Sequence, residues 1–137
     1  MRAVLFCAVL MCGCSGKPEG DKPPKDGTDQ TVNPVAKLTF AELRKEYAHP
    51  IQADVKYKGK FIELTGPVWE IDSDAIGFGA MPTDRATIIC KIDPAHKAEF
   101  TTVKEGKSFT LIGRVAGSHV DEITARIITL DMCRAVK

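Results

Sequence analysis

The chain has 137 residues, which is enough for one domain with a tail. Its 19 lysines and arginines nearly balance its 18 aspartates and glutamates, and residues 39–137 hold 14 of each. Because proteins that bind phosphate backbones usually carry a basic excess, the charge balance argues against nucleic acid as a partner.

Residues 1–13 have the pattern of a signal peptide that is removed on export. Arg2 is a minimal charged region, and Ala3–Met11 is an unbroken apolar run of about half the length that spans a bilayer. The sequence Met11-Cys12-Gly13-Cys14 resembles the lipobox of bacterial lipoproteins, in which the lipid-modified cysteine becomes the mature N-terminus. The resemblance implies that Cys14 carries a palmitate-containing lipid, while Cys12 is a competing position. The protein would then be anchored in the cell envelope on the extracytoplasmic side of a membrane.

Residues 14–37 are interpreted as the lipidated cysteine followed by a disordered linker. Four prolines and three glycines lie between Ser15 and Ala36, so this segment cannot bury enough apolar surface to offset the entropy of ordering. A linker of about 22 such residues has a mean reach on the order of 25 Å. We expect it to hold a folded domain, residues 38–137, clear of the lipid headgroups.

Two helices are predicted at the start of the domain. Thr39 and Glu42 have the spacing of a capping box, so the first helix should begin after Thr39. It should end near Ala48, since Pro50 cannot continue it. A second, short helical piece is expected before Gly59.

The segment Lys60–Ile71 has the period-2 pattern of a strand with one buried face. Gly66 occupies one of the inward positions, and Val68 occupies the next. A strand interior tolerates Gly66 and Pro67 mainly at a bend or bulge, and Trp69 then follows in the opposite phase. The sequence therefore predicts a strand that bends in its middle.

Four further strands are predicted, with a helix between the second and third of these four. Asp93 should cap this helix, and Gly106 should end it after about Glu105. The apolar phase of the last strand changes between Ile127 and Ile128, which predicts a bulge there. The expected strands are Ile76–Met81, Arg85–Ile92, Ser108–Ala116 and about Glu122–Cys133, with a loop at Gly117–Val120.

Three strands, a helix and two more strands follow the element order of the OB-fold, a five-stranded Greek-key barrel. Four parts of the sequence also resemble a known family: Tyr57–Val68, Ile88–Ile92, Glu105–Val115 and the late Cys133. They are similar to the tRNA-anticodon-like OB-fold family found among bacterial lipoproteins. The element order and the capping box together predict a mainly β domain with short helices, in which an N-terminal helix precedes the barrel. The resemblance implies no reaction.

No catalytic constellation is recognisable in the sequence. His49, His96 and His119 lie far apart, and metal-binding spacings such as Cys-x-x-Cys or His-Glu-x-x-His do not occur. We therefore expect the protein not to be an enzyme and to hold no metal or cofactor.

Three side chains are candidates for contacting a ligand: Trp69, Phe78 and His119. OB-folds bind ligands on the face of their second and third strands, where aromatic rings stack on bases or sugars. Phe78 stands between two glycines, which would leave its ring uncovered, and His119 lies in the expected loop before the last strand. Each has a structural alternative, because small barrels need large rings for their cores and turn histidines are usually only solvated.

Cys90 and Cys133 form an even pair in a chain with an export signal, and we predict a disulfide between them. In an OB barrel the third strand runs beside the fifth, and the two cysteines lie late in these strands. Two alternatives stay open: Cys133 faces outward after the suspected bulge, or both are separate buried thiols.

The sequence thus predicts a membrane-anchored bacterial lipoprotein whose OB-fold domain is a binding or structural module for an unidentified ligand. Its partners would be the membrane, through the lipid, and an envelope protein or glycan. The alternative hypothesis is that the face of the second and third strands binds an oligonucleotide or an oligosaccharide.

Overall fold

The computed structural model describes residues 32–79, 88–122 and 125–137. The predicted signal peptide, Cys14 and most of the predicted linker lie outside these ranges. Within them the helices are α1 (Phe40–Glu46), α2 (Pro50–Tyr57) and the 3-10 helix η1 (Pro94–Phe100). The strands are β1 (Lys37–Thr39), β2 (Phe61–Ile71), β3 (Ala75–Phe78), β4 (Ile88–Ile92), β5 (Ser108–Val120) and β6 (Arg126–Ala135).

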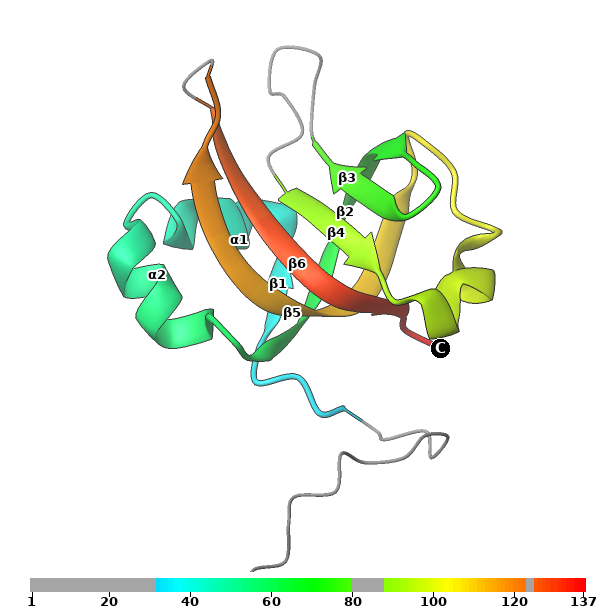
Figure 1. Cartoon of the computed structure of the whole chain (residues 1–137), viewed down its shortest axis with the longest axis horizontal. Coiled ribbons are helices and arrows are strands. Elements are labelled where there is room, and N and C mark those ends of the chain that lie inside the picture. The colour runs from blue at the N-terminus through cyan, green and yellow to red at the C-terminus, as the bar shows by residue number, and fades with distance from the viewer. Residues whose placement is uncertain (1–31, 80–87, 123–124) are drawn as a thin grey trace, which may run out of the picture. The chain divides into compact units, whose positions relative to one another are not determined.

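The strands form a closed barrel (Figure 1). The sheet order is β1-β2-β3-β4-β6-β5, and β2 also pairs with β5, which closes the ring. Inside the ring β4 and β6 run parallel, and the other neighbouring strands are antiparallel. Since η1 lies between β4 and β5 in the chain, the strand order and the helix position are those of the predicted OB-fold.

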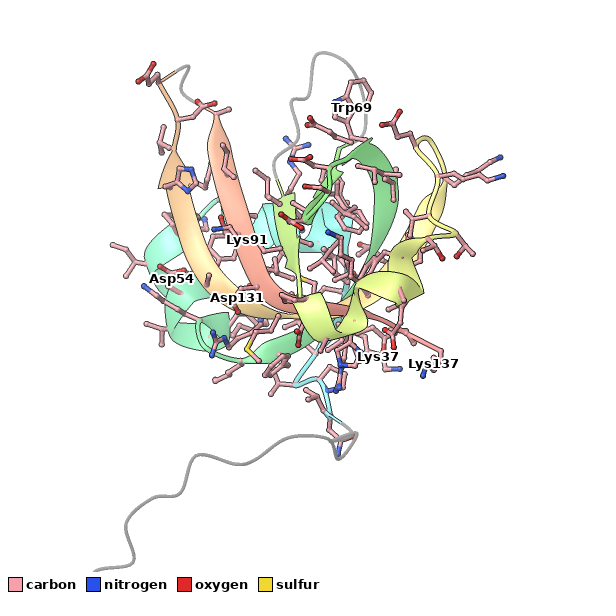
Figure 2. All side chains as sticks on the ribbon, turned by 45° about the vertical axis from the view of Figure 1, so that its right-hand side comes forward. Lys37, Asp54, Trp69, Lys91, Asp131 and Lys137 are labelled. Carbon is pink, nitrogen blue, oxygen red and sulfur yellow. The ribbon has the colours of Figure 1, made fainter. Side chains whose placement is uncertain are left out.

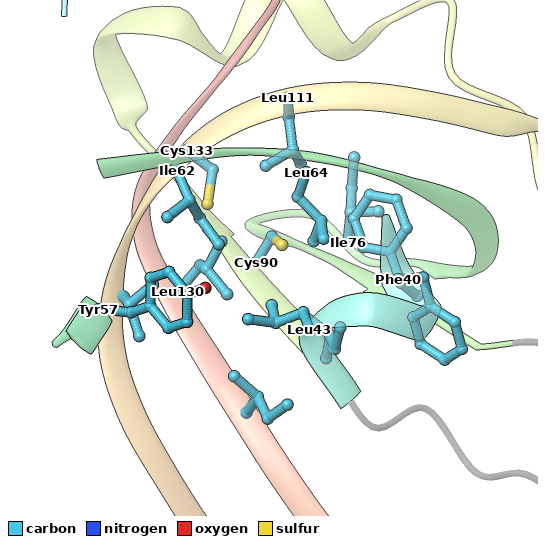
Figure 3. Close-up of a cluster of buried hydrophobic side chains, with 14 of the residues drawn as sticks. Phe40, Leu43, Tyr57, Ile62, Leu64, Ile76, Cys90, Leu111, Leu130 and Cys133 are labelled. Carbon is cyan, nitrogen blue, oxygen red and sulfur yellow. The ribbon is translucent and has the colours of Figure 1, made fainter. Parts of the chain in front are cut away.

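Inward-facing side chains from every strand of the ring fill the barrel (Figure 3). Ile62, Leu64, Ile76, Leu111 and Leu130 are fully buried. Their burial explains why the period-2 pattern of the sequence locates these strands. Thr31–Lys137 forms one compact unit, and this unit has its own hydrophobic core.

Helix α1 covers part of the barrel and begins as predicted. The Thr39 N–H donates to Glu42 Oε2 at 2.7 Å, and the Glu42 N–H donates to Thr39 Oγ1 at 3.3 Å. These two bonds confirm the capping box. Phe40 and Leu43, in the first turns of α1, are buried in the core. The helix ends at Glu46, slightly earlier than predicted.

Two inward positions of the barrel hold glycine because other side chains need the space. A Cβ on Gly66 would lie 2.7 Å from the Cβ of Phe40 and 3.1 Å from the ring of Phe78. A Cβ on Gly113 would lie 2.6 Å from the sulfur of Cys133. Real Cβ contacts are essentially never so short, so close packing in the core requires both glycines.

Several boundaries differ from the sequence prediction. β1 pairs in parallel with β2 and was not predicted, because three residues are too few to show a period. η1 ends at Phe100 rather than Glu105, and the Phe100 ring packs 5.7 Å from that of Phe109. β3 ends at Phe78, and the predicted end of that strand at Met81 lies outside the described residues.

The predicted loop at Gly117–Val120 is wrong, since these residues belong to β5. The pairing of β5 with β6 continues to the partners Val120 and Arg126, so backbone hydrogen bonding extends the strand beyond the glycine. A glycine inside a strand pattern can mark an irregularity instead of a turn, and the register with β6 shifts between Val115 and Gly117.

The bulge in β6 lies later than predicted. Ile128 and Leu130 are buried in alternation, but the next buried residue is Cys133, three positions further on. The extra residue is Met132, which is 44% exposed and has a φ of 50°. The predicted bulge between Ile127 and Ile128 assumed that the apolar Ile127 faces the core. Ile127 instead pairs with His119 near the end of the β5–β6 hairpin, and Ile128 is the first buried residue of β6.

Candidate ligand-binding face

Trp69 is the partly exposed aromatic residue at the C-terminal end of β2. The register of β2 with β3 shifts between Val68 and Glu70, so Trp69 is the extra residue of a bulge. Val68 stays in the core at 2% exposure, whereas Trp69 is 40% exposed. The predicted bend therefore has a consequence for the surface, because it turns the indole ring out of the barrel (Figure 2).

The outward positions beside Trp69 make up what we call the β2–β3–β4 face: Trp69, Glu70, Gly77, Ile89 and Lys91. Glu70 pairs with Gly77, and Gly77 pairs with Ile89, so all three share one side of the sheet. Gly77 adds no side chain and its backbone is buried, while Ile89 is half-buried. The exposed part of the face therefore consists of Trp69, Glu70 and Lys91.

Lys91 is a site candidate that sequence reasoning missed. It stands between Cys90 and Ile92, and its outward phase in β4 was the available signal. The next strands of the ring after β4 are β6 and β5. There Arg114 on β5 donates two hydrogen bonds of 2.8 and 3.0 Å to Asp131 on β6, and these bonds raise the pKa of the guanidinium. Among the described residues no ion pair is found for Lys91, so its ammonium is available to a ligand while Arg114 is already engaged.

Phe78 does not belong to the exposed site, and its assignment as a ligand-binding residue is wrong for this structure. It pairs with Val68 and Ile88 in the inward row, and none of its surface is exposed. The flanking glycines do not leave the ring bare, because it packs over Gly66 inside the barrel. The structural alternative, a core ring, is the correct one.

His119 and Trp69 lie on strands that do not pair with each other at these positions. His119 is exposed near the end of β5, where it pairs with Ile127 of β6, and not in a loop as predicted. β2 and β5 do pair, but only through Phe61–Pro67, so the contact includes neither Trp69 nor His119. The structure therefore does not join the two residues into one site.

Cys90 and Cys133 are both fully buried and carry free thiols in the structure. The bulge at Met132 turns Cys133 inward, so the alternative of an outward-facing Cys133 is wrong (Figure 3). Cys90 pairs with Leu130, whereas Cys133 pairs with Ile92, one step along the inner face of the same two strands. The pKa of the Cys90 thiol is raised well above its usual value, mainly by burial and to a smaller extent by the neighbouring Cys133. The disulfide stays a prediction.

The acidic residues of the β2–β3 turn have structural partners. Asp72 Oδ1 accepts a hydrogen bond of 2.6 Å from the Ser73 N–H, as is common for aspartate in turns. Asp74 Oδ1 binds Lys97 Nζ of η1 at 2.9 Å, and this bond lowers the pKa of Asp74. The turn next to the β2–β3–β4 face is thus tied to η1, and it offers no paired carboxylates for acid–base chemistry.

Two further properties hold for the described part of the chain. It contains no group of three His, Cys, Asp or Glu side chains that could hold a metal ion. None of its helices has the length and apolar character needed to span a bilayer.

Comparison with known proteins supports the fold and gives the family. The tRNA_anti-like family model matches residues 1–127, and a comparison with curated proteins found no match. Among solved structures, the chain is similar to a crystal structure from Klebsiella pneumoniae subsp. pneumoniae MGH 78578 of a "putative nucleic acid-binding lipoprotein". The two share 18% identity with a TM-score of 0.55, and the match covers 82% of this chain and 100% of that one. A similarity at this identity shows the fold alone, and it agrees with the predicted OB barrel. Because the family model covers nearly the whole sequence, the chain belongs to the tRNA_anti-like family.

Proposed function

We propose that the protein is a lipid-anchored binding module of the bacterial cell envelope, not an enzyme, and that its ligand contacts the β2–β3–β4 face. The observation that carries the proposal is the exposure of Trp69. Large rings in a small barrel normally fill the core, yet a bulge turns this one outward to 40% exposure. An exposed aromatic ring on an OB face can stack on a base or on a sugar ring of a ligand.

The charges on the β2–β3–β4 face itself favour an oligosaccharide over a nucleic acid. Glu70 next to Trp69 would repel phosphates, and Arg114 is already bound to Asp131. Lys91 alone of the exposed residues on the face supplies a positive charge. Phosphate backbones are bound by several cations at once, whereas sugar rings need an aromatic surface and a few polar groups.

Nucleic acid is the second candidate, and two observations support it. The similar Klebsiella protein is named for nucleic acid binding, and the combination of Trp69 with Lys91 could stack a base and pair with one phosphate. The two candidates differ in their dependence on salt, since only binding to a polyanion releases counterions.

The proposal can be tested directly because Trp69 is the sole tryptophan of the chain. Its fluorescence should shift saturably when oligosaccharides from the cell wall are added, and a single-stranded oligonucleotide should bind no better than roughly 10⁻⁴ to 10⁻⁶ M at physiological salt. Tight oligonucleotide binding with a steep salt dependence would select the second candidate. No fluorescence change with either class would remove Trp69 from the site.

A matched pair of variants adds specificity to the experiment. Trp69→Ala should weaken binding measured by calorimetry roughly five- to 150-fold, the usual range for one stacked ring. Val120→Ala removes another exposed apolar side chain, at the end of β5, and should leave the affinity unchanged. Equal losses in the two variants would mean that the β2–β3–β4 face is not the binding site.

A further inference from the structure

Helix α2 presents two large apolar side chains to solvent. Ile51 is 81% exposed and Val55 is 80% exposed, more than any other large hydrophobic residue in the described part of the chain. Residues four apart lie on the same face of a helix, so the two form one apolar strip. Single exposed apolar residues are ordinary, but two adjacent ones at this exposure need a reason.

The core does not supply that reason. α2 packs on the barrel through Ala53 and Tyr57, which are 1% and 3% exposed and lie on the other side of the helix. The hydroxyl of Tyr47 also donates to Asp54 Oδ1 at 2.9 Å, which fixes α2 against the end of α1. The helix is therefore held with Ile51 and Val55 pointing away from the protein.

The segment that carries the apolar strip has a basic excess. Residues 44–60 carry five lysines and arginines against two acidic residues, although residues 39–137 as a whole are balanced at 14 of each. Residues 44–60 therefore have a net charge of +3, and the remaining residues of 39–137 have a net charge of −3. Lys56 pairs with Glu46 at 3.0 Å, and Lys60 Nζ donates to the Lys56 backbone carbonyl at 2.9 Å. Lys58 and Lys60 follow the end of α2 and are both exposed.

We propose that α2 docks the domain on an anionic lipid bilayer. Ile51 and Val55 would enter the boundary between headgroups and acyl chains, and Lys58 and Lys60 would contact anionic headgroups. Apolar residues on one side of a helix with lysines beside them are the features of helices that lie in a membrane interface. Phosphate backbones would use the lysines but not the apolar strip, so a bilayer explains both observations together.

The docking surface is separate from the proposed ligand site. In Figure 2, Asp54 of α2 lies at the left of the barrel and Trp69 at its upper right, and in Figure 1 α2 stands outside β5, away from β3. A domain docked through α2 would therefore present the β2–β3–β4 face away from the bilayer, toward ligands in the envelope. The inference goes beyond the proposed function and requires neither the lipid on Cys14 nor a ligand.

The test uses residues 31–137, the compact unit with its own core, so that no lipid anchor is present. The protein is sedimented with vesicles of phosphatidylcholine alone and with vesicles that also contain phosphatidylglycerol. We expect binding to the anionic vesicles that weakens with salt and little binding to the neutral ones. Absence of binding to both would overturn the proposal.

Variants identify the surface. Ile51→Ser combined with Val55→Ser should weaken vesicle binding by about tenfold or more, because it removes apolar area that would leave water. Lys58→Gln and Lys60→Gln should each weaken it roughly fivefold. Val120→Ser, at an exposed site outside α2, should change nothing.

The same variants separate this proposal from the proposed function. Because the exchanged residues in α2 and just after it are exposed, circular dichroism should show an unchanged fold, and the response of Trp69 fluorescence to cell-wall oligosaccharides should be retained. Vesicle binding that is equal in the α2 variants and the parent would assign the membrane contact to another surface and contradict the proposal.

Discussion

The sulfur of Cys133 occupies the space that a side chain on Gly113 would need. The two residues lie on β6 and β5, and a Cβ on residue 113 would lie 2.6 Å from the sulfur and 3.1 Å from Leu130 Cδ2. The bulge at Met132 is what turns Cys133 into this space. Gly113 on β5 and the bulge at Met132 on β6 are therefore linked, because the sulfur that the bulge turns inward fits only where residue 113 has no side chain.

Gly113→Ala should therefore destabilise the domain by roughly 1–3 kcal/mol, the usual cost of overpacking a core. Urea unfolding followed by circular dichroism measures the change. The cost of Gly113→Ala should be smaller in a Cys133→Ala background, because the sulfur is then absent, with a coupling of at least about 0.5 kcal/mol. Strictly additive costs of the two substitutions would show that the sulfur is not what excludes a side chain at position 113.

The residue patterns of the sequence were sufficient for the parts of the fold that local physics determines. The capping box of Thr39 and Glu42 is a short-range pattern, and the structure contains both of its hydrogen bonds. The alternation through Ile88 and Cys90 likewise identified buried positions of β4. Such features depend on neighbours within a few residues, so they can be predicted from one sequence.

Features that depend on distant partners were missed. Phe78 between two glycines suggested an uncovered ring, but Gly66, on another strand, provides the space that buries it. The sequence predicts a loop at Gly117–Val120 that contains His119, whereas pairing with β6 extends the strand through these residues. Only Trp69 was both proposed from the sequence and found exposed on the β2–β3–β4 face.

The pH dependence of stability should report on Glu99. Its carboxylate pairs with His96 Nδ1 at 3.1 Å and accepts a hydrogen bond of 3.2 Å from the Ala135 N–H, which ties η1 to the end of β6. The bond to His96 is the main cause that lowers the pKa of Glu99 below 4.5. A carboxyl whose pKa is lowered in the folded state stabilises the fold above its unfolded pKa, and the stabilisation is lost as the pH falls through the folded pKa.

Glu99→Gln should therefore lower the free energy of unfolding at neutral pH by about 1 kcal/mol, the usual contribution of one hydrogen bond. The difference from the parent should shrink as the pH falls below 4.5. Urea unfolding at a series of pH values measures it, and Glu105→Gln, at an exposed position, controls for the loss of a negative charge. A difference that stays constant across this range would contradict the role given to the Glu99 carboxylate.

Cys14 is predicted to carry the lipid, and this prediction rests on the sequence because the residue lies outside the described ranges. Cys14→Ser should leave the protein without acyl chains, so that it remains as the precursor or is released from membranes. Intact-mass measurement of protein from the membrane fraction tests this directly. Cys12→Ser is the matched control and should be acylated normally, whereas normal acylation of the Cys14 variant would show that another residue carries the lipid.

The disulfide between Cys90 and Cys133 is the prediction that most changes the stability of the domain. Both thiols are fully buried and lie on the inner face of the neighbouring strands β4 and β6. They are not direct backbone partners, since Cys133 pairs with Ile92, but the two thiols are neighbours inside the barrel. Burial raises the pKa of the Cys90 thiol and removes it from solvent, so exchange after folding should be slow.

We therefore expect the bond to form during export, before the barrel closes. The two thiols would each lose a proton and an electron to a disulfide-bearing oxidant of the envelope, which is reduced to two thiols. Closing the loop of about 43 residues between them should stabilise the protein by at most roughly 4 kcal/mol. Labelling of the exported protein, unfolded without reductant, should then find neither Cys90 nor Cys133 reactive, and prior reduction should expose both. If both cysteines react without reduction, the exported protein contains the pair of buried thiols that the structure shows, and Met132 serves only to pack Cys133 into the core.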